Sequence, residues 1–122
     1  MVQKYIKGDI VMYDNKIHTI MDTLELNNYE LSYIEHPVHQ LELSGVPLTL
    51  EILEKNGWKD DGYDWHRLST KRAYLYITKD ITTLGEFLVC VGLDRHNLAS
   101  INFVHQLQHL LFGLNINSEM EA

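Results

Sequence analysis

The sequence of 122 residues contains one cysteine, two prolines and no long apolar stretch. Because a lone thiol cannot form an internal disulfide, nothing favours a secreted, disulfide-stapled fold. Every apolar run is much shorter than the roughly 20 residues that a membrane-spanning helix needs, and the start of the chain does not read as a signal peptide. We therefore expect a cytoplasmic protein that makes no use of a membrane.

Basic residues are also scarce, since ten Lys and Arg stand against 17 Asp and Glu and give a formal net charge of −7. Nucleic acids are normally bound by clustered Lys and Arg. Here the densest cluster is Arg67 with Lys71 and Arg72, which flanks a predicted turn. The charge balance disfavours nucleic acid as a partner but is compatible with a local basic rim for a small anion.

Motifs that mark the common enzyme classes are missing from the sequence. It contains no Gly-rich phosphate loop, no Gly-x-Ser-x-Gly elbow and no paired cysteines for a metal. Cys90 lies in the apolar run 87–91, so we expect a buried small hydrophobe and not a nucleophile. Asp64 and His66 could share one face of a strand, but this alone does not favour catalysis. We expect a protein that is not an enzyme and that uses no cofactor.

Seven histidines raise the question of a metal site. His105 and His109 lie four residues apart on a predicted helix and point the same way, but the glutamate of the metalloprotease motif is missing between them. His36 and His39 have no cysteine pair to complete a closed zinc site. We therefore expect no metal, and we expect His105 and His109 to form a polar face that is solvated or packed against a partner.

Short strand patterns dominate the chain. The first part, residues 1–45, is β-rich, with turn signals at Asp14-Asn15 and Asn27-Asn28 and strand-like segments at 10–13, 16–21, 29–34 and 38–43. The later part, residues 63–91, reads as a hairpin of 63–68 with 72–78 followed by a strand at 86–91. Polar turns are expected at 59–62 and 92–97, and a loop at 79–85.

Two helices complete the prediction. Thr49 as N-cap and Gly57 as C-terminal stop delimit a short helix within 49–57. Apolar residues at spacings of three and four predict an amphipathic helix over 100–114 that docks on a sheet. The sequence thus predicts one α+β domain over residues 1–122, built on a small antiparallel β-sheet or partly open barrel with a short middle helix and a C-terminal amphipathic helix packed on the sheet.

Four stretches together resemble an uncharacterised family of small proteins from anaerobic gut bacteria, their phages and mobile elements. The most specific is the late motif Val104-His105-Gln106-Leu107-Gln108, and the others are residues 7–11, 46–58 and 74–77. The chain departs from the family after this helix, where Gly113-Leu114-Asn115 replaces a common Thr-Gly-Glu turn. The resemblance implies a phage or mobile-element protein, and it carries over no catalytic residue.

Aromatic residues near the basic cluster suggest a binding site. Rings can stack on a base while an arginine forks a phosphate, so the candidate ligand-binding residues are Tyr63, Trp65, Arg67, Arg72 and Tyr74. Ordinary packing at the edges of a thin sheet is the competing explanation for the aromatic residues.

These observations favour a non-enzymatic binding protein that sequesters a small ligand, with a nucleotide as one candidate, or that binds a host protein in an anti-defence role. One alternative is a nucleic-acid-associated small barrel, because Lys7-Gly8-Asp9-Ile10-Val11 is similar to the opening of Tudor-like and KOW-like barrels. Another is a metal-dependent enzyme that uses histidines. We also expect a homodimer, with an interface on the side of the last helix that carries His105, His109 and Phe112.

Overall fold

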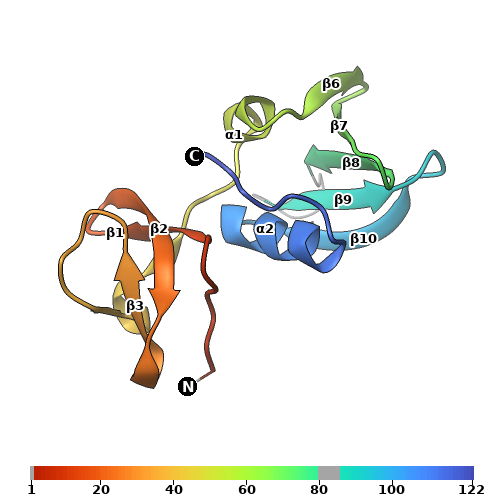
Figure 1. Cartoon of the computed structure of the whole chain (residues 1–122). Coiled ribbons are helices and arrows are strands. Elements are labelled where there is room, and N and C mark those ends of the chain that lie inside the picture. The colour runs from red at the N-terminus through yellow and green to blue at the C-terminus, as the bar shows by residue number, and fades with distance from the viewer. Residues whose placement is uncertain (1, 80–85) are drawn as a thin grey trace. The chain divides into compact units, whose positions relative to one another are not determined.

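The computed structural model describes residues 2–79 and 86–122 and has an α+β architecture with antiparallel sheets (Figure 1). The helices are α1 (Leu50–Lys55) and α2 (Val104–Gly113), with short 3-10 turns η1 (Glu25–Asn27) and η2 (Gln40–Glu42). The strands are β1 (Ile10–Tyr13), β2 (Lys16–Thr23), β3 (Asn28–Leu31), β4 (Val38–His39), β5 (Ser44–Gly45), β6 (Lys59–Gly62), β7 (Trp65–Ser69), β8 (Tyr74–Lys79), β9 (Phe87–Val91) and β10 (His96–Ile101).

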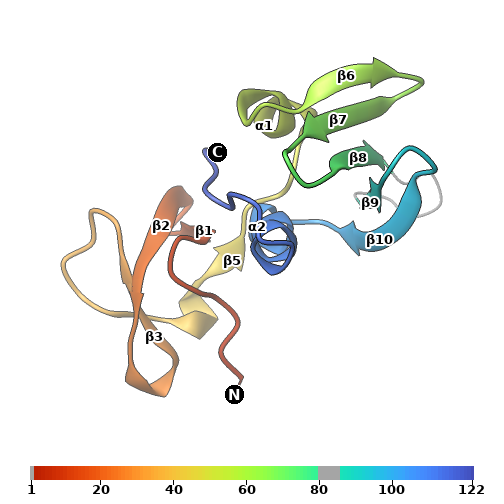
Figure 2. The ribbon, with the colours of Figure 1, turned by 45° about the vertical axis from the view of Figure 1, so that its right-hand side comes forward.

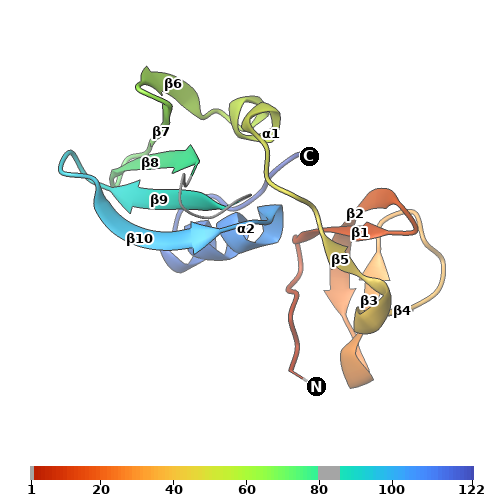
Figure 3. The same cartoon turned by 180° about the vertical axis from the view of Figure 1, so that it is seen from behind.

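The chain divides into two compact units, of which the first comprises Met1–Pro47 and Phe103–Ala122. Its sheet has the open order β4-β3-β2-β1-β5, in which β5 pairs with β1 (Figure 3). Asp14 and Asn15 join β1 to β2 with φ of 50° and 62°, as a two-residue hairpin turn requires. The buried side chains of this sheet form one cluster: Tyr5, Val11, Ile20, Tyr29, Leu31, Val38 and Leu43.

Helix α2 belongs to this first unit and is tied to it by hydrogen bonds. The Val104 amide donates to the Val46 carbonyl over 2.9 Å. Gln108 Oε1 accepts from the Ile10 amide and Gln108 Nε2 donates to the Gly8 carbonyl, both over 2.9 Å. One buried glutamine thus holds the start of β1 against the helix, because it pairs backbone groups that burial would otherwise leave unsatisfied.

The second unit, Leu48–Asn102, contains α1 and a sheet in which sequential neighbours pair, in the order β10-β9-β8-β7-β6 (Figure 2). One face of this sheet carries the fully buried side chains Leu75, Ile77 and Val89. Helix α1 lies on the same side, since its Glu54 reaches His66 of β7 at 3.3 Å.

The signals that predicted α1 are confirmed. Thr49 Oγ1 accepts from the Ile52 amide over 3.2 Å, so Thr49 is the N-cap. Gly57 has a φ of +91°, and the Trp58 amide folds back to donate to the Leu53 carbonyl over 3.1 Å. Leu53 and Trp58 are both buried, and they anchor the helix in the second unit.

Three segments differ from the expectation. The last helix begins at Val104 and not at Ser100, because residues 96–101 pair with β9 as strand β10. Residues 59–62, expected as a turn, form β6, and the polar tip at 92–97 is a turn only as far as Arg95. In each case ladder hydrogen bonds to a neighbouring strand outweigh the polar local composition. Of the loop expected at 79–85, residues 80–85 lie outside the described residues.

Candidate functional site

The face of the second sheet opposite Leu75, Ile77 and Val89 gathers aromatic and basic residues. Trp65 and Arg67 alternate along β7 with His66, and Tyr74 and Tyr76 alternate along β8 with buried Leu75. Arg67 pairs directly with Tyr76 across the two strands. Because directly paired residues of antiparallel strands point to the same side, these four side chains share one surface. We call it the aromatic–arginine face, together with Asp61 and Arg95.

Arg95 reaches this face from the turn between β9 and β10, where its φ is 52°. Its guanidinium carbon lies 5.0 Å from the ring centre of Trp65 and 4.7 Å from that of Tyr76. The two rings are nearly perpendicular, with centres 6.3 Å apart and an interplanar angle of 88°. Tyr76 is only 3% exposed, so Arg95 and Trp65 cover a ring that points away from the sheet's core.

Arg67 makes a second cation–π contact of the same kind. Its guanidinium carbon lies 5.4 Å from the ring centre of Tyr74, which is 44% exposed. The carboxylate of Asp61 lies 3.8 Å from Arg67 and 3.5 Å from Arg95. A single carboxylate therefore faces two guanidinium groups, and both arginine side chains stay partly exposed. Arg67, Arg95 and Asp61 together therefore carry a net positive charge.

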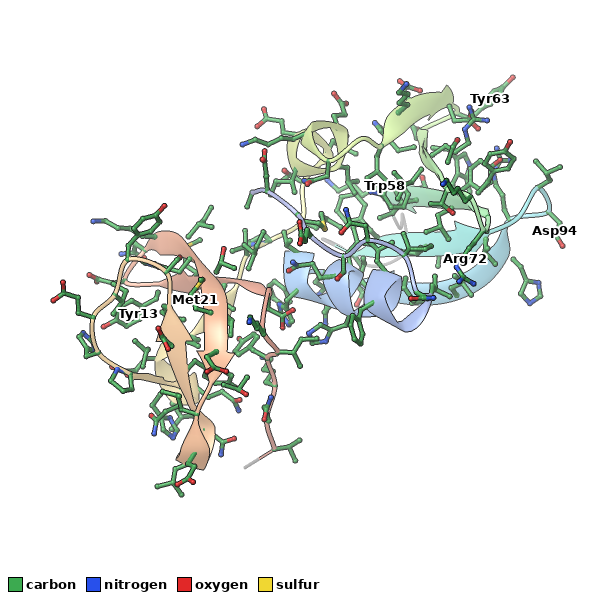
Figure 4. The ribbon with its side chains drawn as sticks, in the orientation of Figure 1. Tyr13, Met21, Trp58, Tyr63, Arg72 and Asp94 are labelled. Atoms are coloured by element: carbon green, nitrogen blue, oxygen red, sulfur yellow. The ribbon has the colours of Figure 1, made fainter. Side chains whose placement is uncertain are left out.

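The structure brings together three of the five predicted ligand-binding residues, namely Trp65, Arg67 and Tyr74. Tyr63 is 98% exposed in the turn between β6 and β7, where Figure 4 shows it at the tip of the hairpin. Arg72 lies in the turn at the other end of β7, exposed, with its amide bonded to Thr70 Oγ1. Tyr63 and Arg72 are thus at opposite ends of a strand and cannot contact one small ligand together.

Sequence reasoning missed Tyr76, Arg95 and Asp61. The alternation of β8 could have placed Tyr76 on the same face as Tyr74, since the two residues lie two positions apart on one strand. Arg95 and Asp61 carry no such signal. Arg95 reaches the face from the turn between β9 and β10, and Asp61 from the irregular pairing of β6 with β7, so the position of each depends on strand pairing.

Cys90 is buried at 2% exposure, as expected, and pairs with Tyr76 in the strand register. Burial raises the pKa of its thiol, and nearby Arg95 lowers it by a smaller amount. The net shift keeps the sulfur protonated, which does not suit a nucleophile.

The histidines of α2 lie in the first unit and differ from each other. The expectation that His105 lies on a polar face is wrong: it is 3% exposed, its ring stacked on Phe103 with centres 5.8 Å apart and edge-on to Tyr5 at 5.1 Å. Burial, with smaller contributions from His109 and Lys4, lowers the pKa of His105 to about 4. The α-helical periodicity did not reveal this, because the N-terminal segment covers the side of α2 that the sequence pattern leaves polar.

His109 and Phe112 are more accessible than His105. His109 Nε2 lies 2.6 Å from Oδ2 of buried Asp9, and Phe112 is 66% exposed. A role of these residues between two copies of the chain stays a prediction.

Other histidines also have protein partners. His66 is buried and contacts Glu54, whereas Asp64 sits in the β6–β7 turn with a φ of 66°, so the two do not form a dyad. His39 Nδ1 accepts from the Leu41 amide over 3.1 Å. Within residues 2–79 and 86–122, no group of three or more His, Cys, Asp or Glu is placed to hold a metal ion.

Comparison of the chain with models of known protein families, with curated proteins and with solved structures found no match. Over the described part of the chain, no helix combines the length and apolar character needed to cross a membrane. The aromatic–arginine face is therefore interpreted from its own geometry.

Proposed function

We propose that this chain is a non-enzymatic binding protein that holds a ligand with a flat ring and a negative charge, such as a nucleotide, on the aromatic–arginine face. The observation that carries the proposal is the pair of guanidinium groups held over aromatic rings, Arg67 over Tyr74 and Arg95 over Trp65 and Tyr76, which share the carboxylate of Asp61. Sequestering such a ligand needs no catalytic group.

A ring contact positions an arginine without using its hydrogen-bond donors. A guanidinium held over a ring by cation–π attraction keeps N–H groups that can donate to two oxygens of a phosphate. The side chain is also partly immobilised, so less conformational entropy is lost when the anion binds. Tyr74 and Trp65 are partly exposed and offer ring surface on which a base can stack.

The charge distribution supports an anionic ligand on the second unit. Leu48–Asn102 carries seven of the chain's ten Lys and Arg and eight of its 17 Asp and Glu, so it is close to neutral. The first unit carries the remaining three basic and nine acidic residues. The acidic net charge of the whole chain therefore does not describe the surroundings of Arg67 and Arg95.

The resemblance of the late helix motif to phage and mobile-element proteins agrees with such a role. A protein that withdraws a nucleotide signal from a cytoplasmic host defence would act by occupancy alone. Binding of a host protein through exposed tyrosines is the competing mode, and it requires no affinity for a nucleotide.

The test is a calorimetric titration of the whole chain with mononucleotides, cyclic dinucleotides, adenosine and ribose 5-phosphate. We expect the nucleotides to bind more tightly than adenosine, which has no phosphate, and than ribose 5-phosphate, which has no ring. Arg67→Gln should weaken nucleotide binding by at least about tenfold, because a charge-assisted hydrogen bond is lost. Lys16→Gln, which removes an equal charge from an exposed site of the first unit, should leave it unchanged.

Two outcomes would contradict the proposal. One is the absence of binding by every nucleotide, and the other is an equal effect of Arg67→Gln and Lys16→Gln. A single-stranded oligonucleotide that binds more tightly than any mononucleotide, with an affinity that falls steeply with salt, would instead favour the nucleic-acid-associated barrel.

A further inference from the structure

The first unit has an open groove with a mixed apolar and polar lining beside the end of β3, separate from the aromatic–arginine face. The groove is open to solvent and has a volume of about 800 Å³. Its lining comes from β2, β3 and the turn that follows: Thr19, Met21, Glu30, Leu31, Ser32, Tyr33, Ile34 and Glu35. Figure 4 labels Met21 on β2. We propose that this groove binds a segment of a partner protein that combines an apolar anchor with Lys or Arg.

The pairing of β2 with β3 is irregular beside the groove. Ile20 pairs with Leu31 and Asp22 with Glu30, so Met21 is an extra residue with no partner opposite it in the β2–β3 ladder. Such a bulge twists the strand and redirects the side chain. Met21 is 47% exposed, and Ile17, on the same strand, is 48% exposed. Methionine adapts its shape to different apolar groups, which suits a surface that receives a side chain.

Tyr33 is the most unusual residue of the groove. It is 98% exposed, and its φ of 63° places a bulky non-glycine residue in the left-handed region. The turn keeps this conformation through hydrogen bonds from the Ile34 amide to the Leu31 carbonyl and from the Ser32 amide to the Thr19 carbonyl. Its ring face is accessible to a cation, and Lys or Arg over tyrosine is a favourable contact.

The charge around the groove indicates which kind of peptide segment would bind there. The carboxylates that line the groove, Glu30 and Glu35, are both exposed, and no Lys, Arg or His is among the lining residues. Asp22, opposite Glu30, adds a further carboxylate beside the groove. An apolar segment that carries Lys or Arg would satisfy both the apolar lining and the acidic rim, whereas an acidic segment would be repelled. The occupant we infer is therefore a cationic, apolar peptide segment.

The experiment selects binders for the folded chain from a displayed library of random peptides. Synthetic copies of the selected peptides are then titrated by fluorescence anisotropy against three proteins: the unaltered chain, Glu30→Gln with Glu35→Gln, and Glu51→Gln with Glu119→Gln. The last pair removes the same charge from exposed positions outside the groove. We expect peptides enriched in Lys or Arg and in aliphatic residues, with binding weakened about tenfold by the groove pair only.

A third variant, Met21→Ser with Tyr33→Ser, removes apolar contact without changing charge and should also weaken binding. Circular dichroism of each variant shows whether it is folded before it is titrated. The proposal is overturned if selection gives no peptide, if the selected peptides are not cationic, or if both charge pairs weaken binding equally, because that pattern reflects net charge alone. It is also overturned if Met21→Ser with Tyr33→Ser binds as the unaltered chain does.

Discussion

His109 Nε2 on helix α2 lies 2.6 Å from Asp9 Oδ2, at the start of β1, a hundred residues earlier in the chain. Asp9 is 2% exposed, and the same carboxylate oxygen accepts from the Ile6 amide over 2.9 Å. Burial raises the pKa of Asp9, whereas the Ile6 and His109 hydrogen bonds lower it by less. The contact joins the first strand of the chain to its last helix within one unit.

This contact predicts a measurable coupling. Asp9→Ala should lower the free energy of unfolding by about 3 kcal/mol, because it leaves the Ile6 amide and His109 without their acceptor. His109→Ala should cost less, since Asp9 keeps one hydrogen bond. In a double-mutant cycle measured by denaturant unfolding, we expect a coupling energy of about 1 kcal/mol or more. Additive effects of the two substitutions would show that the contact between Asp9 and His109 contributes no coupling energy.

Gly45 of β5 is predicted to be irreplaceable for a steric reason. A Cβ at this position would lie 2.6 Å and 2.7 Å from two ring atoms of Phe103 and 3.0 Å from Cε1 of His105. Gly45→Ala should therefore cost about 1–3 kcal/mol in denaturant unfolding, because the half-buried ring of Phe103 must shift.

Gly113 supplies the matched control for that substitution. It lies at the end of α2 with no atom within 4 Å of an added Cβ. Gly113→Ala should be neutral or stabilise by up to about 1 kcal/mol, since alanine favours helix. Equal effects of the two substitutions would contradict the close packing of β5 against Phe103.

Stability should depend on pH through His105. The pKa of this histidine is about 4 in the folded chain and takes the ordinary value of 6.5 when unfolded, so the unfolded state binds more protons between these values. The free energy of unfolding should thus fall by about 2 kcal/mol between about pH 7 and about pH 5. Asp9 has the opposite effect on stability in the lower part of this pH range. Because burial raises its pKa, the folded state binds a proton there more readily than the unfolded state does.

The variant His105→Phe tests this, since phenylalanine keeps a ring on Phe103 but cannot titrate. Its free energy of unfolding should change less with pH than that of the unaltered chain, while His36→Gln, at an exposed histidine, should follow the unaltered chain. Parallel pH profiles for all three proteins would show that His105 is not the titrating group.

Self-association is expected through the exposed side of α2. Light scattering at high concentration should give a dimer mass for the unaltered chain and a lower mass for Phe112→Ser, which removes a 66% exposed ring. Leu93→Ser is the matched control, because Leu93 is 79% exposed but lies in the second unit. A strictly monomeric unaltered chain, or equal effects of the two substitutions, would remove this interface.

Local signals predicted much of the fold. Asp14-Asn15 indicated a tight hairpin, and Thr49 with Gly57 delimited α1, because caps and left-handed turns are decided by a few adjacent residues. Ser100 was misassigned to a helix since its strand conformation depends on pairing with Leu88, which no local signal reports.

The candidate site likewise combines residues that local sequence indicates with a residue that only strand pairing adds. The sequence indicates Trp65 and Arg67 because aromatic and basic residues lie close together there, but Arg95 joins them only through the register of β10 on β9.

By itself, the sequence determined the α+β class, the position of α1 and the amphipathic character of the last helix, because propensity, capping and apolar spacing act over a few residues. The tertiary structure alone decided that the strands form two sheets, that His105 is buried against Tyr5 and Phe103, and that Arg95 covers Trp65 and Tyr76. These features depend on contacts between residues far apart in the chain, where the free energy of packing and strand pairing outweighs local preference.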